Sequence, residues 1–135
     1  MRLLILVLML FSVKSYSQKG GVVWVDMVKV KDNHHKEVLY FLENNWKVYR
    51  DSAVKKGYIR SYKFLKNISD SIMNVDYILI TEYHDQESFL KREEFFQPIM
   101  KAARPNGPIS LNALKRDEIL SFPFSYKTEV LYGEK

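Results

Sequence analysis

The stretch that most constrains the fold is residues 77–100, YILITEYHDQESFLKREEFFQPIM, which predicts a buried strand leading directly into a helix. Its first seven residues are mostly β-branched or aromatic, which suits a pleated and buried surface. Asp85 is a good N-cap, because its carboxylate accepts hydrogen bonds from the free N–H groups of a first helical turn. Phe89, Phe96 and Met100 then recur at helical spacing. Pro98 lacks a backbone donor and predicts a kink or restart of this helix.

A first strand is predicted over residues 22–30, where VVWVDMVKV alternates across two faces. Trp24 and Asp26 share one face. Asp26 is the unusual residue, because it places a carboxylate in the middle of an apolar strand. Such a group either pairs with a cation or has a raised pKa. Arg60 is the best cationic partner available, so an Asp26–Arg60 pair stands beside a functional role for Asp26.

A long helix is predicted over about residues 34–56, followed by Gly57 as a natural C′ residue. Its apolar stripe, expected to face the core, consists of Val38, Leu42, Trp46, Tyr49 and Ala53. Its charged residues, expected on the other faces, are Lys36, Glu43, Lys47, Arg50 and Lys55. Two further strands are predicted over residues 58–66 and 126–132, with a weakly helical stretch over 110–121.

The predicted order is β-α-β-β-α-β, which is the α+β, ferredoxin-like arrangement of a four-stranded antiparallel sheet with both helices on one face. The opposite face would be exposed in a monomer. Apolar residues from the first and third strands would lie on it, namely Val23, Val25, Met27, Ile78 and Ile80. That much exposed apolar surface predicts a homodimer formed through this face.

Residues 1–17 have the pattern of a secretory signal peptide. Arg2 supplies the positive start, and an apolar run over residues 3–11 is too short for a comfortable membrane span. Ser15 and Ser17 are small residues before a cleavage at Gln18. The alternative is an N-terminal membrane anchor. We therefore expect an exported protein, periplasmic or secreted, with residues 18–135 as a single domain that has no stable membrane span.

The charge and the residue types exclude several functions. The formal net charge is +5, of which Arg2 and Lys14 contribute two, and the basic residues are scattered, so nucleic acid is not an expected partner. The chain has no cysteine, which rules out disulfides and a thiolate nucleophile. No metal-binding spacing and no nucleotide-binding glycine loop is present. No cofactor and no metal is therefore predicted.

The strand ending in TEYHDQESF and the helix containing EFFQPIM resemble the dimeric α+β barrel proteins, in particular their antibiotic-biosynthesis monooxygenase and NIPSNAP-like branches. The resemblance covers about residues 22–103 and the last strand. It implies two sheets packed face to face, a pocket between each sheet and its helices, and cofactor-free oxygenase activity. The haem-degrading branch has Asn, Trp and His at positions that match approximately Asp26, Tyr83 and Met100. Met100 cannot replace an imidazole as the iron ligand, so haem degradation is not expected.

Two residues are candidates for catalysis. Asp26 is one, and His84 is the other, because a histidine at a strand-to-helix corner can act as a general base near neutral pH. A surface histidine is the alternative for His84. His34 and His35 are adjacent at a helix start, where solvated side chains are the usual outcome.

The residues expected to line a ligand pocket are Trp24, Asp26, Trp46, Arg60, Tyr62 and Tyr83. Aromatic residues at these spacings also suit an ordinary core. Two function classes remain. One is a small oxygenase-like enzyme acting on an aromatic or otherwise apolar small molecule. The other is a non-catalytic exported binding protein or structural homodimer.

Overall fold

The computed structural model describes residues 20–69 and 74–131, so the predicted signal peptide lies outside the described residues. A 3-10 turn, η2, covers Leu111–Ala113. The remaining elements, in chain order, are β1 (Val22–Val30), α1 (His35–Phe41), the π-helical turn η1 (Leu42–Trp46), α2 (Lys47–Lys55), β2 (Ser61–Lys66), β3 (Tyr77–Tyr83), α3 (Gln86–Leu90), α4 (Arg92–Ala103), α5 (Arg116–Ile119) and β4 (Leu120–Glu129).

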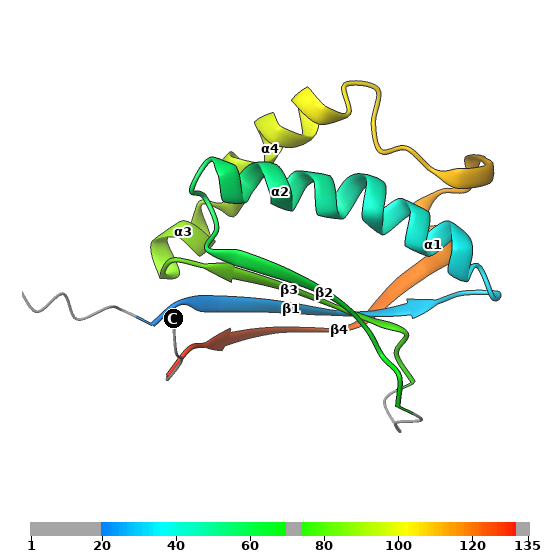
Figure 1. The fold of residues 1–135 in the computed structure, drawn as a ribbon, viewed down its shortest axis with the longest axis horizontal. Coiled ribbons are helices and arrows are strands. Elements are labelled where there is room, and N and C mark those ends of the chain that lie inside the picture. Colours follow the sequence, from blue (N-terminus) through cyan, green and yellow to red (C-terminus); the bar gives the residue numbers. More distant parts are fainter. Residues whose placement is uncertain (1–19, 70–73, 132–135) are drawn as a thin grey trace, which may run out of the picture.

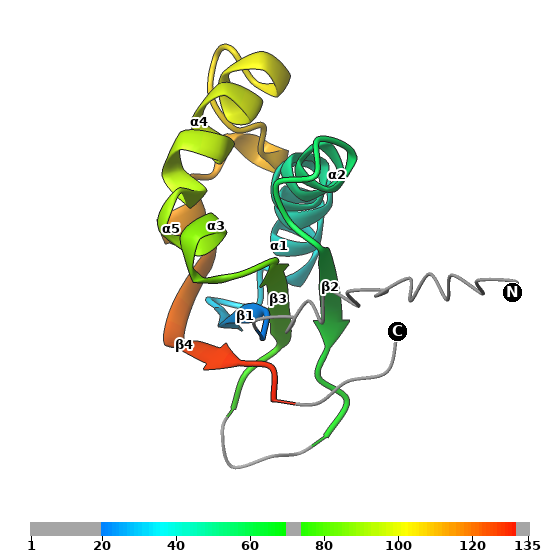
Figure 2. The same ribbon diagram turned by 90° about the vertical axis from the view of Figure 1, so that its left-hand side faces the viewer.

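The strands form one antiparallel sheet in the order β2-β3-β1-β4. This order, with helices between β1 and β2 and between β3 and β4, is the ferredoxin-like fold, which confirms the predicted fold class. Figures 1 and 2 show that the helices all lie on the same side of the sheet. No described helix or strand covers the other side. None of the described helices has the length and apolar character that a membrane span requires.

The strand-to-helix stretch folds as its sequence predicts. In β3, Tyr77, Leu79, Thr81 and Tyr83 are buried toward the helices, and the residues between them are only partly buried. Asp85 caps α3, because its Oδ1 accepts a hydrogen bond from the backbone N–H of Ser88 at 2.7 Å. The strand and the cap together set the direction in which α3 and α4 run back over the sheet.

The long helix predicted over residues 34–56 consists of α1, η1 and α2, and all five residues of its predicted apolar stripe are buried. It runs through η1 without a break, and Gly57 ends it with φ of +71°. The π-helical turn is a feature that the sequence pattern did not predict. Its wider turn changes which side chains face the sheet, and such turns often occur at functional sites.

Three predicted boundaries were wrong. Pro98 lies inside the continuous α4, and the helix instead restarts at Lys91, between α3 and α4. Strand β2 begins at Ser61, because the chain first buries Ile59 in the core. Strand β4 begins at Leu120 and includes Pro123, which an edge strand tolerates beside a register shift such as the one opposite residues 27–29.

The space between helices and sheet holds two separate groups of buried side chains. One group includes Val28, Leu42 and Ile119 and lies under α1 and α5. The other includes Tyr49 and Ile99 and lies between α2, α4 and the opposite end of the sheet. Two clusters leave room for a space between them, and that space is the candidate site.

Candidate functional site

A cavity of about 750 Å³ lies between the sheet and the helices. Members of both core clusters line it, so it lies between them. Its volume falls within the usual range for small-molecule sites. The residues that line it are Trp24, Asp26, Phe41, Asn45, Trp46, Tyr49, Arg50, Tyr83, Arg92, Glu93, Phe96, Met100, Pro108, Ser110, Ala113, Leu114, Lys115, Arg116 and Phe122.

The sheet contributes Trp24, Asp26 and Tyr83 to the cavity wall. Trp24 donates from Nε1 to Asp26 Oδ1 at 2.8 Å, and the hydroxyl of Ser125 donates to the same oxygen at 2.5 Å. Ser125 lies directly opposite Asp26 in the strand pairing. Trp24 also stacks on Phe89, with ring centroids 5.6 Å apart. These contacts fix the carboxylate and leave its Oδ2 without a hydrogen-bond donor among the described residues.

The π-helical turn shapes the opposite wall. Its buried Asn45 donates to the carbonyl oxygens of Phe41 and Ile109 and accepts from the backbone N–H of Ile109 at 2.9 Å. The two bonds to Ile109 hold the loop that carries Pro108 and Ser110 against the helix. Asn45 is thus a fully satisfied buried polar group that sets the position of one side of the cavity.

Arg50 brings a positive charge into this wall. The sequence pattern had instead predicted that Arg50 lies on a face of the helix directed away from the core. Its guanidinium carbon lies 4.6 Å from the ring centroid of Trp46 and 4.5 Å from that of Phe96. Burial lowers the pKa of Arg50 to about 10, so the group stays charged at neutral pH. The i,i+4 spacing of Trp46 and Arg50 is the signal that could have found it, because such pairs meet on a helix surface.

Two phenols complete the buried part of the lining. Burial raises the pKa of Tyr83 and also that of Tyr49, so both hydroxyls are neutral at physiological pH. Neither hydroxyl makes a hydrogen bond to a described residue. Both are therefore free to donate to, or accept from, a molecule in the cavity.

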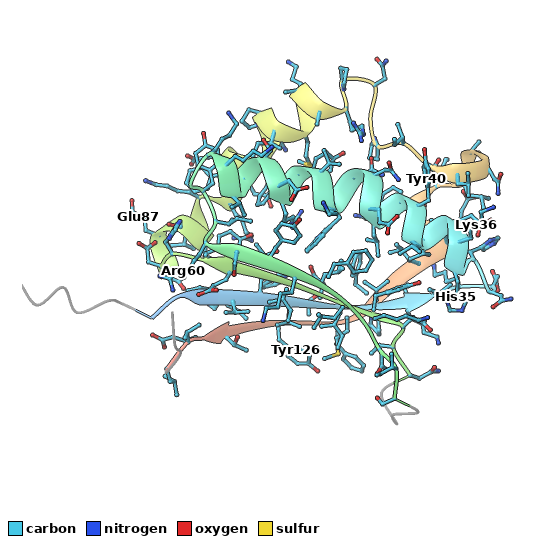
Figure 3. All side chains as sticks on the ribbon, viewed as in Figure 1. His35, Lys36, Tyr40, Arg60, Glu87 and Tyr126 are labelled. Atoms are coloured by element: carbon cyan, nitrogen blue, oxygen red, sulfur yellow. The ribbon has the colours of Figure 1, made fainter. Side chains whose placement is uncertain are left out.

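The structure brings four of the six predicted pocket residues together, namely Trp24, Asp26, Trp46 and Tyr83. The predicted Asp26–Arg60 pair does not form. Arg60 lies outside the cavity lining, near the start of α3 in Figure 3, and pairs with Glu82 at 2.9 Å. The reason is register: Arg60 precedes β2 and lies beside the end of β3, whereas Asp26 lies in the middle of β1.

Two other predicted residues also lie outside the lining. Tyr62 packs edge-on against Trp46 and donates its hydroxyl to Asp51 at 2.5 Å, which fixes it as a supporting residue behind the wall. His84 approaches the carbonyl oxygen of Gly57 at 3.1 Å, at the corner between β3 and α3. His34 lies at the start of α1, where its Nδ1 is 3.6 Å from Glu37.

Within residues 20–69 and 74–131, no group of three His, Asp or Glu side chains is placed to hold a metal ion. The polar groups of the cavity are instead two carboxylates, four cations and two phenols. This set suits hydrogen bonding and charge recognition of an organic molecule.

No protein-family model and no curated protein matches the sequence significantly. Among solved structures, the chain is similar to a dimeric ferredoxin-like protein of unknown function from Thermobifida fusca YX. The two are 11% identical, the match covers 86% of this chain and 94% of that one, and the TM-score is 0.48.

Proposed function

We propose that this protein binds an apolar or aromatic small molecule in the cavity between its sheet and its helices. The cavity itself carries the proposal. More than half of its lining residues are aromatic or aliphatic, and polar groups such as Asp26 and Asn45 are held at defined points, as in other small-molecule sites. A protein core of the same residues would close such a space, because interiors pack densely.

Binding of aromatic compounds, followed by calorimetry or by quenching of Trp24 and Trp46, tests this proposal. Ser110 lines the cavity, so Ser110→Trp should fill it and abolish binding. Ser69→Trp is the matched control, because Ser69 is exposed in the connection after β2. A wild-type protein that binds no aromatic or apolar compound, or a Ser110→Trp variant that binds normally, would contradict the proposal.

We also propose that two copies associate through the open face of the sheet, as in the dimeric α+β barrels that the sequence resembles. The open face is the side opposite the helices, and its side chains come from all four strands. Phe124 and Tyr126 are each 45% exposed there, and Tyr126 points away from the helices in Figure 3. They lie beside Val25 and Met27, and Ile80 pairs with Val25 from the other side.

A second copy is the occupant that this open face fits best. Its centre has no charged side chain, while Lys29, Lys63 and Glu82 lie toward its ends and edges. An apolar centre with a charged rim is typical of an interface between folded proteins. Two identical faces of this kind are self-complementary, as a two-fold dimer requires.

Cofactor-free oxygenation is a second candidate function, and Asp26 is the observation that favours it. Such a reaction needs a base that removes a substrate proton before dioxygen reacts. Asp26 lines the cavity, the bonds to Oδ1 hold its carboxylate in place, and Oδ2 has no hydrogen-bond donor among the described residues. Oxygen uptake with a bound phenolic compound should be lost in Asp26→Asn. Binding without oxygen uptake would rule out oxygenation and leave ligand binding as the only proposed function of the cavity.

Export completes the proposal and rests on the signal-like pattern of residues 1–17. The mature protein is expected to start near Gln18. The intact mass of protein recovered from the medium or periplasm of its native host tests this expectation. Retention of residues 1–17 in that material would contradict it.

A further inference from the structure

Two aromatic rings contact the guanidinium of Arg50, and its terminal nitrogens have no hydrogen-bond acceptor among the described residues. Its guanidinium carbon lies over both rings, 4.6 Å from the ring centroid of Trp46 and 4.5 Å from that of Phe96. Contact with two rings limits the movement of this planar group. The N–H groups of a guanidinium point outward in that plane, so they remain available to an acceptor in the cavity.

The protein supplies almost no acceptor for these N–H groups. Arg50 Nε lies 3.4 Å from the hydroxyl oxygen of Thr81, which is a long hydrogen bond. Neither terminal nitrogen donates to a described residue, and no described carboxylate lies within 4.0 Å of the group. Asp26 favours the charged form of Arg50 only through the electric field.

The other partly buried arginines of the described chain donate from their terminal nitrogens to carbonyl oxygens, although the buried Nε of Arg104 has no partner. Arg92 donates to the carbonyl oxygen of Phe89 at 3.0 Å. Arg104 donates to the carbonyl oxygens of Ala103 and Asn44. Arg50 is thus the one of these three whose terminal nitrogens face a cavity rather than a protein acceptor. Burying a charge without a partner is costly, so its placement here favours an anion supplied from outside.

We propose that the molecule bound in this cavity carries a carboxylate, which accepts a pair of hydrogen bonds from the edge of Arg50. This inference rests on the proposed ligand-binding function and names the chemical class of the ligand. The planar fork of a guanidinium matches the two oxygens of a carboxylate. The ring system or aliphatic chain of the ligand then lies against the apolar wall.

The choice of a carboxylate over a phosphate monoester rests on its planar match with the guanidinium of Arg50. The other charged side chains of the lining act in both directions, because Asp26 and Glu93 repel any anion and Arg92 attracts it. Lys115 and Arg116 are exposed residues of the lining, where they attract an anion toward the entrance. Arg50, in contrast, is held against two rings, and its planar fork of N–H groups matches the two oxygens of a carboxylate.

Calorimetric titration with three matched probes tests the inference: 2-naphthoate, its neutral amide 2-naphthamide and 2-naphthyl phosphate. Wild-type protein should bind naphthoate about tenfold to a hundredfold more tightly than the amide, as expected for hydrogen bonds to a charged group. Arg50→Met keeps an apolar chain beside the rings and removes the charge, so it should bind naphthoate and the amide with similar affinity. Arg60→Met is the control, because Arg60 lies outside the cavity lining.

Each outcome decides a different point. Equal binding of naphthoate and the amide by wild type, or a preference that survives Arg50→Met, would overturn the carboxylate inference while the proposed binding function stands. Tighter binding of the phosphate than of the carboxylate would overturn the choice of anion. Binding of none of the three probes would count against the proposed function itself. A thermal melt of Arg50→Met that matches wild type verifies that any lost binding is not lost folding.

Discussion

The two faces of the sheet are built from alternate residues of the same strands, yet they are occupied in opposite ways. The face under the helices carries aromatic rings and a carboxylate, and together with the helices it bounds a cavity of about 750 Å³. The open face carries Val25, Ile80, Phe124 and Tyr126 with no described element over them. A cavity with fixed polar groups suits a small molecule. A broad apolar face suits another protein surface.

The proposed ligand binding would therefore use the covered face, and the proposed dimer would use the open face. Polar groups can be placed on the covered face because neighbouring side chains satisfy them, as Trp24 and Ser125 do for Asp26. The centre of the open face has no such groups, so it loses little when water is removed from it. The experiments below act on one face at a time, beginning with the largest expected effect.

Ile80→Asp should change the open face most. In the proposed dimer this side chain is covered by the partner, so an aspartate there would be an unpaired buried charge costing about 3–5 kcal/mol. Sedimentation velocity should show a monomer or aggregate in place of a dimer. Ile68→Asp is the control, because Ile68 is 93% exposed in the connection after β2. A wild-type protein that sediments as a monomer at micromolar concentration would remove the basis for the dimer.

A pair of leucine truncations measures how tightly each face is packed. Leu79 is 1% exposed under the helices, so Leu79→Ala should lower the free energy of unfolding by about 2–5 kcal/mol. Leu65 is 41% exposed on the open side of β2, and Leu65→Ala should lower it by less than about 1 kcal/mol. Urea denaturation gives both values. Equal losses would mean that the open face is packed as closely as the covered one.

A smaller effect is expected from the cap that directs α3 over the covered face. Asp85→Ala should lower the free energy of unfolding by about 1 kcal/mol at neutral pH. The hydrogen bond from the backbone of Ser88 lowers the pKa of Asp85 in the folded protein. Its stabilisation is therefore complete above the unfolded-state pKa, near about 4, and is lost as the pH falls through the folded-state pKa.

Stability curves of wild type and Asp85→Ala measured against pH should therefore converge below about pH 4. Asp85→Asn is the informative control, since asparagine caps helices well but does not titrate in this range. A difference between wild type and the alanine variant that stays constant down to low pH would show that the cap does not depend on the charge.

Asp26→Asn should have the smallest effect on stability. Asparagine keeps an oxygen that accepts from Trp24 and Ser125, so we expect a loss of less than about 1 kcal/mol in thermal or urea unfolding. Removing the negative charge should raise the affinity for 2-naphthoate a few-fold and leave that for 2-naphthamide unchanged. A loss of several kcal/mol would instead mean that Asp26 is part of a charge pair required for folding.

Sequence reasoning predicted the elements and their order because periodicity is a local property of the chain. The strand at residues 77–83, the cap at Asp85, the helix stripe and the end at Gly57 depend mainly on neighbours within a few residues. The alternation along β1 likewise assigned Trp24 and Asp26 to the helix side. The boundaries of β2 and β4 were missed, because they depend on which distant strand offers hydrogen bonds and where a register shift falls.

The sequence by itself therefore determined the ferredoxin-like element order, the apolar stripe and two chemically distinct sheet faces. Only the tertiary structure decided which charges enter the cavity. Arg50 and Arg60 are the same residue type. The sequence patterns predicted Arg60 in the pocket and Arg50 outside it, whereas the structure has Arg50 in the cavity lining and Arg60 outside it. Arg60 reaches Glu82 across the end of the sheet, whereas the helix packing encloses Arg50 between Trp46 and Phe96. Phe96 of α4 meets Arg50 of α2 only when these two helices pack against each other, and no pattern within either helix contains that contact.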